Sequence, residues 1–246
     1  MSTLLLRLAA PMQSWGSDSK FERRTTQREP TKSGVIGMLA AALGRGRDED
    51  LSDLSALKFG VRIDQPGQIL KDFHTVWRPD SAKETYFDNR YKGPYVTNRY
   101  YLVDAVFVIG LSGDVGFLKE LCDAVRAPVY PLFLGRRSCP PDANIVLGIR
   151  DTSLENALYE EPWQAGLWYQ KREIRRNKNL RLTMVTDSAD VGANRRRDLP
   201  ISFNQKHRKH AYRYIDDKPL AVPASNICRA FIAESATEHD PFNEVL

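Results

Sequence analysis

Within the first 150 residues, apolar residues repeat with the period of a β-strand in some segments and with the period of an α-helix in others. Alternating or continuous apolar runs predict strands at residues 3–9, 56–64, 100–111 and 144–150. Apolar residues three and four positions apart predict one helix before Gly44 and a second at residues 114–126. Pro11 is expected to end the first strand.

The first helix carries start and stop signals of its own. Thr31 or Ser33 can cap its first turn, and Gly44 can end it. Gly34 and Gly37 lie in its opening turns, where glycine costs helix stability. Glycines there indicate that something packs very close to this helix, and a neighbouring strand and the backbone of a ligand both remain open.

The order strand, helix, strand, strand, helix, strand predicts an α+β protein. This order is that of the ferredoxin-like or RRM-type plan, an antiparallel sheet with two helices on one face. Residues 1–150 are therefore expected to form one domain.

Two further regions depart from that plan. The stretch LKDFHTVW predicts a short strand, and the basic, tyrosine-rich residues that follow predict a protruding thumb at about residues 77–99. Residues 151–246 are expected to form a basic, β-rich region packed on the first domain. It includes a short helix near 152–159, and the tail from about 217 stays unassigned.

Charge is concentrated in one segment of the chain. The formal net charge is +5, yet residues 171–213 hold thirteen Lys and Arg against four acids, so that segment is +9 and the rest is −4. Phe203 and Tyr212 lie within it, Tyr214 follows it directly, and all three could stack on nucleobases. A binder of polyanions has this charge pattern, and so does a solvated basic face, so charge alone leaves both open.

The cysteines and the first residues suggest where the protein works. Cys122, Cys139 and Cys228 are few and far apart, which argues against a disulfide framework or a zinc site and favours a reducing compartment. The apolar run at the start is short and is interrupted by Arg7, unlike a membrane span or signal peptide. We expect a cytoplasmic protein that needs no cofactor or metal and contacts no membrane.

No catalytic motif is evident around the four histidines. His207 and His210 are three positions apart in a basic stretch, where contact with phosphate or solvent competes with metal binding. His74, near tyrosines and lysines, could serve metal-free RNA cleavage as a general acid or base. It could equally be a strand histidine with a hydrogen-bonded neighbour.

The corner LGRRSCPP places two arginines between a glycine and two prolines. Gly135 could let the backbone approach a ligand, while Arg136 and Arg137 offer planar forks for phosphates or guanine edges. Alternatively, one arginine pairs with a carboxylate such as Asp142 or Asp123 and staples the turn.

Several stretches, taken in chain order, resemble CasD, the fifth Cas protein family, in its subtype I-E form. They are LRLAAPMQSWG, PTKSGVIGMLAAALGRGRDED, DFHTV, YYLVDAVFVIGL, LGRRSCPP and RRRDLPISF, and they span most of residues 3–214. The resemblance implies a RAMP-superfamily protein with a modified ferredoxin-like fold and a thumb. In that family the subunit caps the 5′ handle of the CRISPR RNA in the Cascade complex. The implied partners are this RNA, the CasC backbone subunit, the CasA large subunit, other Cascade subunits and, indirectly, target DNA.

The resemblance also implies where RNA is held. The family's helix start corresponds to Lys32, Ser33, Gly34 and Gly37, where backbone N–H groups suit a phosphate. Its Gln and Trp pair corresponds to Gln13 and Trp15. With the basic and aromatic residues of the thumb, the corner and the basic segment, the predicted RNA-binding residues are Gln13, Trp15, Arg24, Arg28, Lys32, Ser33, Gly34, Arg90, Tyr95, Arg99, Arg136, Arg137, Arg195, Arg196, Arg197, Lys206 and Arg208.

Catalysis is not expected. The subtype I-C member of the family cuts precursor RNA itself, whereas subtype I-E uses a separate CasE subunit, and PMQSWG and GRRSCPP point to I-E. The alternative is a metal-independent endoribonuclease that uses His74 with Tyr91 or Lys92. A protein-only scaffold would leave the +9 segment unexplained.

Overall fold

The computed structural model describes residues 1–16, 22–76, 95–177 and 180–221. Within these ranges one sheet holds nine strands. The strands are β1 (Ser2–Gln13), β2 (Arg23–Arg24), β3 (Lys58–Gln65), β4 (Gln68–Val76), β5 (Tyr95–Gly113), β6 (Val146–Arg150), β7 (Arg181–Asp187), β8 (Asn194–Ser202) and β9 (Lys209–Ala221). The helices are α1 (Lys32–Ala42), α2 (Ser52–Ala56), α3 (Val115–Arg126), α4 (Leu154–Glu160) and α5 (Leu167–Arg176). None of the described helices is long and apolar enough to cross a membrane.

The strands expected from the sequence lie side by side in the order β6-β1-β5-β3, with β6 at one edge of the sheet, and each pairs antiparallel with its neighbour. The prediction of an α+β protein built on an antiparallel sheet is confirmed. The expected end of the first strand is wrong, because β1 continues past Pro11 to Gln13. Since β6 pairs only with residues 3–6 of β1, the missing N–H of Pro11 breaks no hydrogen bond on that side.

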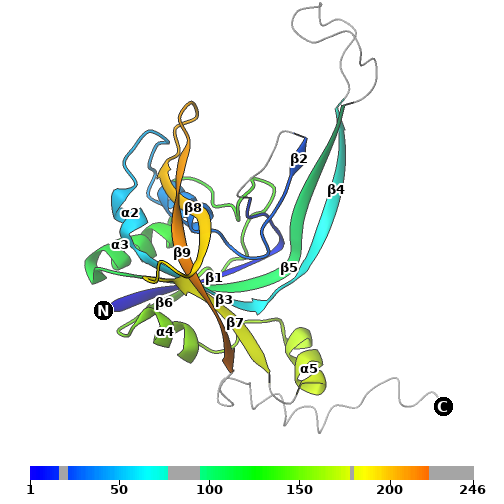
Figure 1. Cartoon of the computed structure of the whole chain (residues 1–246), viewed down its shortest axis with the longest axis vertical. Helices are drawn as coiled ribbons and strands as arrows, with labels where there is room; N and C mark the ends of the chain where they lie inside the picture. The colour runs from blue at the N-terminus through cyan, green and yellow to red at the C-terminus, as the bar shows by residue number, and fades with distance from the viewer. Residues whose placement is uncertain (17–21, 77–94, 178–179, 222–246) are drawn as a thin grey trace, which may run out of the picture.

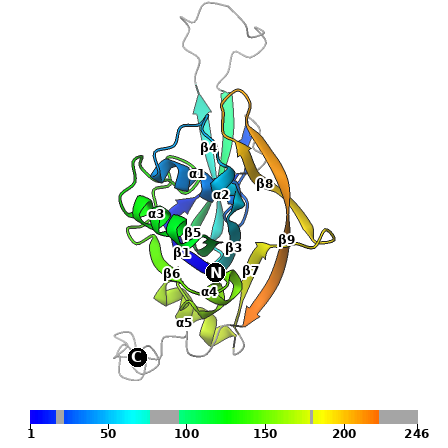
Figure 2. The ribbon, with the colours of Figure 1, turned by 90° about the vertical axis from the view of Figure 1, so that its left-hand side faces the viewer.

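Both faces of this four-stranded part of the sheet are covered. Leu4, Leu6 and Leu8 lie in the main core with α1 and α3, the two expected helices. The other face, however, packs against α4, where Leu5 of β1 meets Leu158. The sheet is therefore a middle layer between helices (Figures 1 and 2).

The signals around α1 are confirmed in detail. The hydroxyl of Thr31 caps the helix by accepting from the N–H of Gly34 at 3.2 Å, and Gly44 follows it with a φ of +76°. A Cβ on Gly34 would lie 2.8 Å from the ring of Trp15, and one on Gly37 would lie 3.6 Å from Phe203. The groups that pack close to these glycines are therefore the aromatic side chains of Trp15 and Phe203.

The sheet continues into the C-terminal half of the chain. β7 pairs antiparallel with β3, and β9 and β8 follow it outward. The expected helix near 152–159 is α4, but β7, β8 and α5 were not predicted. β9 also runs to Ala221, beyond the position where the tail was expected to begin. The division of the chain at residue 150 stays a prediction.

Two antiparallel pairs leave the sheet and project from the same side of the molecule, as Figures 1 and 2 show. We call them the β4–β5 arm and the β8–β9 arm. β5 belongs to both the core and the first arm, and Asp104 marks the passage with a φ of +56°. Residues 77–94 of the predicted thumb lie outside the described residues, and residues 95–99 are strand β5.

A buried ion pair joins β3 to the segment between α4 and α5. Arg62 donates from Nε and Nη2 to both carboxylate oxygens of Asp64, at 2.7 and 2.9 Å. Its remaining donors reach the carbonyls of Leu158, Glu161 and Pro162 at 2.6 to 2.9 Å. Burial raises the pKa of Asp64, and the charge and hydrogen bonds of Arg62 oppose that rise only in part. With its fork fully satisfied, Arg62 anchors the C-terminal half to the sheet.

Replacing Asp64 with Ala should therefore destabilise the fold strongly. The change leaves the Arg62 guanidinium buried without its counter-ion, which costs about 3–5 kcal/mol. Urea unfolding followed by circular dichroism measures this loss. As a control, Arg126→Ala removes an exposed pair with Asp123 at 3.7 Å and should cost less than about 0.5 kcal/mol. Equal losses in the two variants would show that the buried pair anchors nothing.

Candidate nucleic-acid interface

The corner LGRRSCPP is fastened to the end of β1. The N–H of Ser14 donates to the carbonyl of Leu134 at 3.0 Å, and the N–H of Leu134 donates to the carbonyl of Cys139 at 2.8 Å. Gly135 has a φ of +89°, and a Cβ there would lie 1.7 Å from the carbonyl oxygen of Ser14. Gly135 does allow a close backbone approach, as expected, but the group that approaches it is the carbonyl of Ser14 and not a ligand.

The two arginines of the corner have different surroundings. Arg136 lies over the ring of Tyr101 at 4.7 Å, and its Nη2 donates to the carbonyl of Arg24 at 2.9 Å. Arg137 is exposed, and no described residue forms an ion pair or hydrogen bond with it. Arg136 therefore braces the corner against β2 and β5, while Arg137 faces solvent.

Basic residues also gather where β2 joins the β4–β5 arm. Arg24 lies opposite Arg99 in the parallel pairing of β2 with β5. Arg23, which the sequence did not single out, lies over the ring of Tyr100 at 5.3 Å. Arg24 and Arg28 are exposed, and Arg99 is half-buried. The base of this arm thus presents arginines beside aromatic rings.

The β8–β9 arm repeats this combination. Arg195 lies over Tyr212 at 4.5 Å and within 6.0 Å of Tyr214 on the paired strand. At its tip, Arg208 lies 5.8 Å from the ring of Phe203. Tyr212 is 55% exposed, so an aromatic residue of this arm is accessible from solvent. Further exposed cations of the arm are Arg197, Lys206 and Lys209.

One cation of this arm is already paired. Arg196 forms an ion pair with Glu29, which lies just before α1. This pair joins the arm to the core and reduces the charge that Arg196 can offer an RNA. We therefore assign Arg196 a positioning role.

The start of α1 differs from the phosphate site that the resemblance implied. The hydroxyl of Thr31 already holds the N–H of Gly34, and the carboxylate of Asp198 accepts from the N–H of Lys32 at 2.9 Å. Lys32 and Ser33 are buried. The chain supplies its own anion to the positive end of this helix, so the N–H groups of Lys32 and Gly34 already have partners within the chain.

The side chain of Lys32 enters a buried ion cluster. Its Nζ donates to the carbonyl of Leu57 at 2.7 Å and to Asp187 at 3.0 Å. Arg213 of β9 binds the other oxygen of Asp187 at 2.6 Å and both oxygens of Asp198 at 2.6 and 3.0 Å. Burial disfavours the charge of Arg213, but the hydrogen bonds and charges of the two carboxylates outweigh it and raise its pKa. The cluster fixes the β8–β9 arm to α1.

Gln13 and Trp15 are also interior residues. Gln13 has no exposed surface, and its amide donates to the carbonyls of Leu8 and Ala105 at 3.2 and 2.8 Å. Its carbonyl accepts from the indole N–H of Trp15 at 3.1 Å. Because Trp15 is 1% exposed and packs on Gly34, neither side chain can touch RNA in this conformation.

The residues proposed for catalysis are only partly described. His74 is an exposed residue of β4 opposite Thr97, whereas Tyr91 and Lys92 lie outside the described residues. Arg90 does too, and nothing is described of the side chain of Tyr95. Within the described ranges, no three His, Cys, Asp or Glu side chains stand close enough to hold a metal ion.

His207 and His210 do not share a helix. His207 is exposed at the tip of the β8–β9 arm, and His210 lies in β9 beside Phe203, with ring centroids 6.4 Å apart. Burial, together with the cations Arg208 and Arg197, lowers the pKa of His210. The lowered pKa favours the neutral form of its ring.

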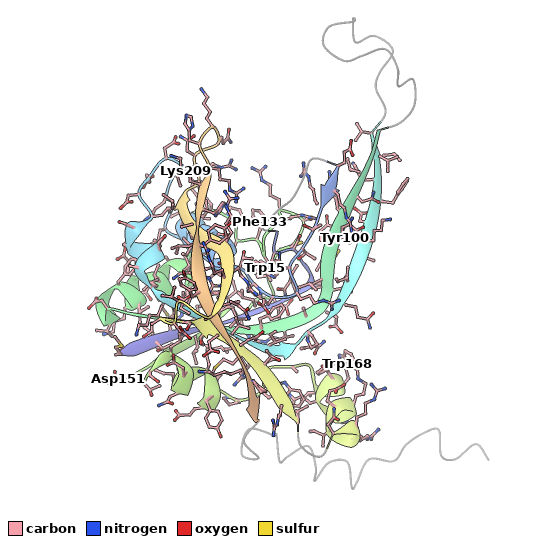
Figure 3. The ribbon with its side chains drawn as sticks, in the orientation of Figure 1. Trp15, Tyr100, Phe133, Asp151, Trp168 and Lys209 are labelled. Carbon is pink, nitrogen blue, oxygen red and sulfur yellow. The ribbon has the colours of Figure 1, made fainter. Side chains whose placement is uncertain are left out.

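The interface as a whole lies on the side toward which both arms point. Figure 3 shows Tyr100 on the first arm, Lys209 on the second, and Trp15 and Phe133 between them. Arg23, Tyr100 and Tyr101 were not predicted from the sequence. The arginine and tyrosines of RYYLVD could have pointed to Tyr100 and Tyr101, whereas Arg23 is brought beside them only by the pairing of β2 with β5.

Comparison with known proteins gives consistent matches. The family model described as CRISPR-associated protein (Cas_Cas5) matches residues 3–216. The CRISPR system Cascade subunit CasD of Escherichia coli (strain K12) is 40% identical over 162 residues, which cover 60% of this chain and 70% of that protein.

Solved structures agree with this. A chain of a CRISPR RNA-guided surveillance complex superposes with a TM-score of 0.74 at 35% identity, over 91% of this chain and 92% of the other. A second structure, described as a crystal structure of Cas protein, gives 0.67 at 33% identity, over 91% and 96%.

The chain matches both structures over most of its length, and its sheet carries two basic arms with aromatic residues. These observations define its class as a CRISPR-associated protein. Because the family model covers far more than half of the chain, the protein belongs to the Cas5 family.

The different surroundings of the corner arginines predict different effects of their removal. Arg136→Ala loses the stack on Tyr101 and the hydrogen bond to Arg24, so it should cost about 1–3 kcal/mol of stability. Arg137→Ala should change stability by less than about 0.5 kcal/mol. Thermal unfolding of the two variants measures the difference, and the reverse order would overturn the bracing role of Arg136.

Proposed function

We propose that this protein is the CasD subunit of a Cascade complex, and that it holds the 5′ handle of the CRISPR RNA with its two arms. The likeness to CasD and to a subunit of an RNA-guided surveillance complex supports the first part. The arginines that lie over aromatic rings, above all Arg195 over the exposed Tyr212, support the second.

A handle excised from a repeat is single-stranded, and proteins bind single strands with cations for the phosphates and aromatic rings for the bases. Both arms supply this pair of groups. Stacking also fixes each guanidinium before RNA arrives, so less side-chain entropy is lost on binding. The proposed RNA contacts are Arg23, Arg24, Arg28, Arg99, Arg137, Arg195, Arg197, Lys206, Arg208 and Tyr212, with Arg90 and Tyr95 kept from the sequence analysis.

The same proposal covers the fold type and the partners. The order β6-β1-β5-β3 with α1 and α3 on one face is that of a ferredoxin-like domain, so we interpret the fold as a modified ferredoxin-like fold of the RAMP superfamily. The family resemblance supports contacts with the CasC backbone subunit, the CasA large subunit and other Cascade subunits. It also supports an indirect role toward target DNA, in the cytoplasm.

The arms should account for the salt dependence of RNA binding. We expect Arg195→Ala/Arg208→Ala to weaken binding of the cognate handle RNA about tenfold at low salt. The slope of log affinity against log salt should fall by roughly 0.7 for each phosphate that the variant no longer neutralises. Fluorescence anisotropy with labelled handle RNA across a salt titration measures both.

The control removes the same charge from another part of the surface. Lys119→Ala/Arg126→Ala takes two exposed cations from α3, and handle affinity and slope should stay at the wild-type values. If this control and the arm variant lost affinity equally, net charge and not the arms would explain binding.

The protein should leave its RNA uncut. Cognate repeat RNA incubated with the protein in a metal chelator should remain full-length on a denaturing gel, because no described group completes an acid–base pair with His74. Cleavage at one position that disappears in His74→Ala would establish the endoribonuclease alternative instead.

A further inference from the structure

Helix α5 lies at the end of the molecule opposite to the one toward which the two arms project (Figures 1 and 2). Its inner face is well anchored. The buried amide of Gln170 donates to the carbonyls of Trp163 and Ala165 at 3.1 and 2.8 Å. One turn on, Ile174 packs against the small core that includes Trp163 and Leu182. The orientation of α5 is therefore fixed by its own contacts.

The outer face of α5 combines an exposed aromatic ring with cations. Trp168, Arg172 and Arg175 are spaced i, i+4 and i+7, which places them on one face of a helix. Trp168 is 52% exposed, and Arg172 lies 5.0 Å from its ring and 4.8 Å from Tyr169. Figure 3 shows Trp168 at the end of the molecule away from Lys209.

This face is strongly positive. Arg172, Arg175, Arg176 and Lys171 stand against one acid of the helix, Glu173. The carboxylate of Glu173 bonds Arg172 at 3.1 Å and accepts from Asn177 beyond the end of the helix. The helix dipole alone favours cations in the last turn, but it does not explain an exposed tryptophan beside them.

We propose that this face of α5 is a second nucleic-acid contact, which binds a single-stranded segment separate from the RNA held by the arms. The positive charge is complementary to phosphates, and an open indole offers a stacking surface that only an unpaired base can reach. A duplex would use the cations and leave Trp168 without a partner. The surface stands apart from the proposed handle site and does not depend on it.

Binding of a labelled 20-nucleotide oligothymidylate, measured by anisotropy, tests the proposal. The full-length chain is first saturated with unlabelled handle RNA, so that the arms are occupied. We expect the oligonucleotide still to bind and to quench tryptophan fluorescence. Trp168→Ala should weaken its binding about tenfold, and Arg175→Ala/Arg176→Ala should lower the salt slope by roughly 1.4.

Controls separate this site from the arms. Handle RNA affinity should be unchanged in both α5 variants, and Lys119→Ala/Arg126→Ala should leave oligothymidylate binding unchanged. Full competition by handle RNA would show one shared site and overturn the proposal. If the chain does not bind handle RNA at all, the titration is repeated in Arg195→Ala/Arg208→Ala, where weaker binding on Trp168→Ala still supports a site on α5.

Two other outcomes would also overturn the proposal. In the first, both α5 variants bind oligothymidylate as the wild type does but no longer co-purify with Cascade subunits. This face would then be a protein contact. Preference for a duplex of the same length, with Trp168→Ala neutral, would leave only a general attraction of phosphates to charge.

Discussion

The position of the β8–β9 arm depends on the buried cluster of Lys32, Asp187, Asp198 and Arg213. Arg213 holds both carboxylates, and these in turn take the side chain and the backbone N–H of Lys32. Lys32, Asp198 and Arg213 are buried and Asp187 is partly buried, and buried charges are costly unless every partner is present, so the cluster favours this one geometry. It thereby fixes the position of the β8–β9 arm, the surface proposed to face RNA, relative to helix α1.

This cluster also explains why the helix start is so rich in special residues. A lysine, a threonine and two glycines at the beginning of α1 look like a phosphate site. In the structure they receive Asp198, Trp15 and Phe203 from other parts of the chain. The start of α1 is therefore the point at which the end of β1, α1 and the β8–β9 arm are joined.

The sequence predicts the central sheet well because each of its strands and its two main helices carries a clear apolar period. β8 and α5 were not predicted because arginines and lysines interrupt that period. β7 is a short strand with only three apolar residues, and its place in the sheet comes from pairing with β3 and β9. Candidate contacts divide in the same way. Exposed arginines of the arms could be found from charge, whereas composition could not show that Gln13, Trp15 and Lys32 are buried. Equally, neighbouring arginines such as Arg136 and Arg137 look alike in sequence and differ only in what surrounds them.

β5 has a mechanical consequence. Because one unbroken strand runs through the core and out along the first arm, that arm is a cantilever and not a hinged flap. A force at its outer end is resisted by the ladder that β5 forms with β1 and β3. Bending would concentrate at Asp104, where the backbone already departs from strand geometry. A partner that grips this arm therefore pulls on the centre of the sheet.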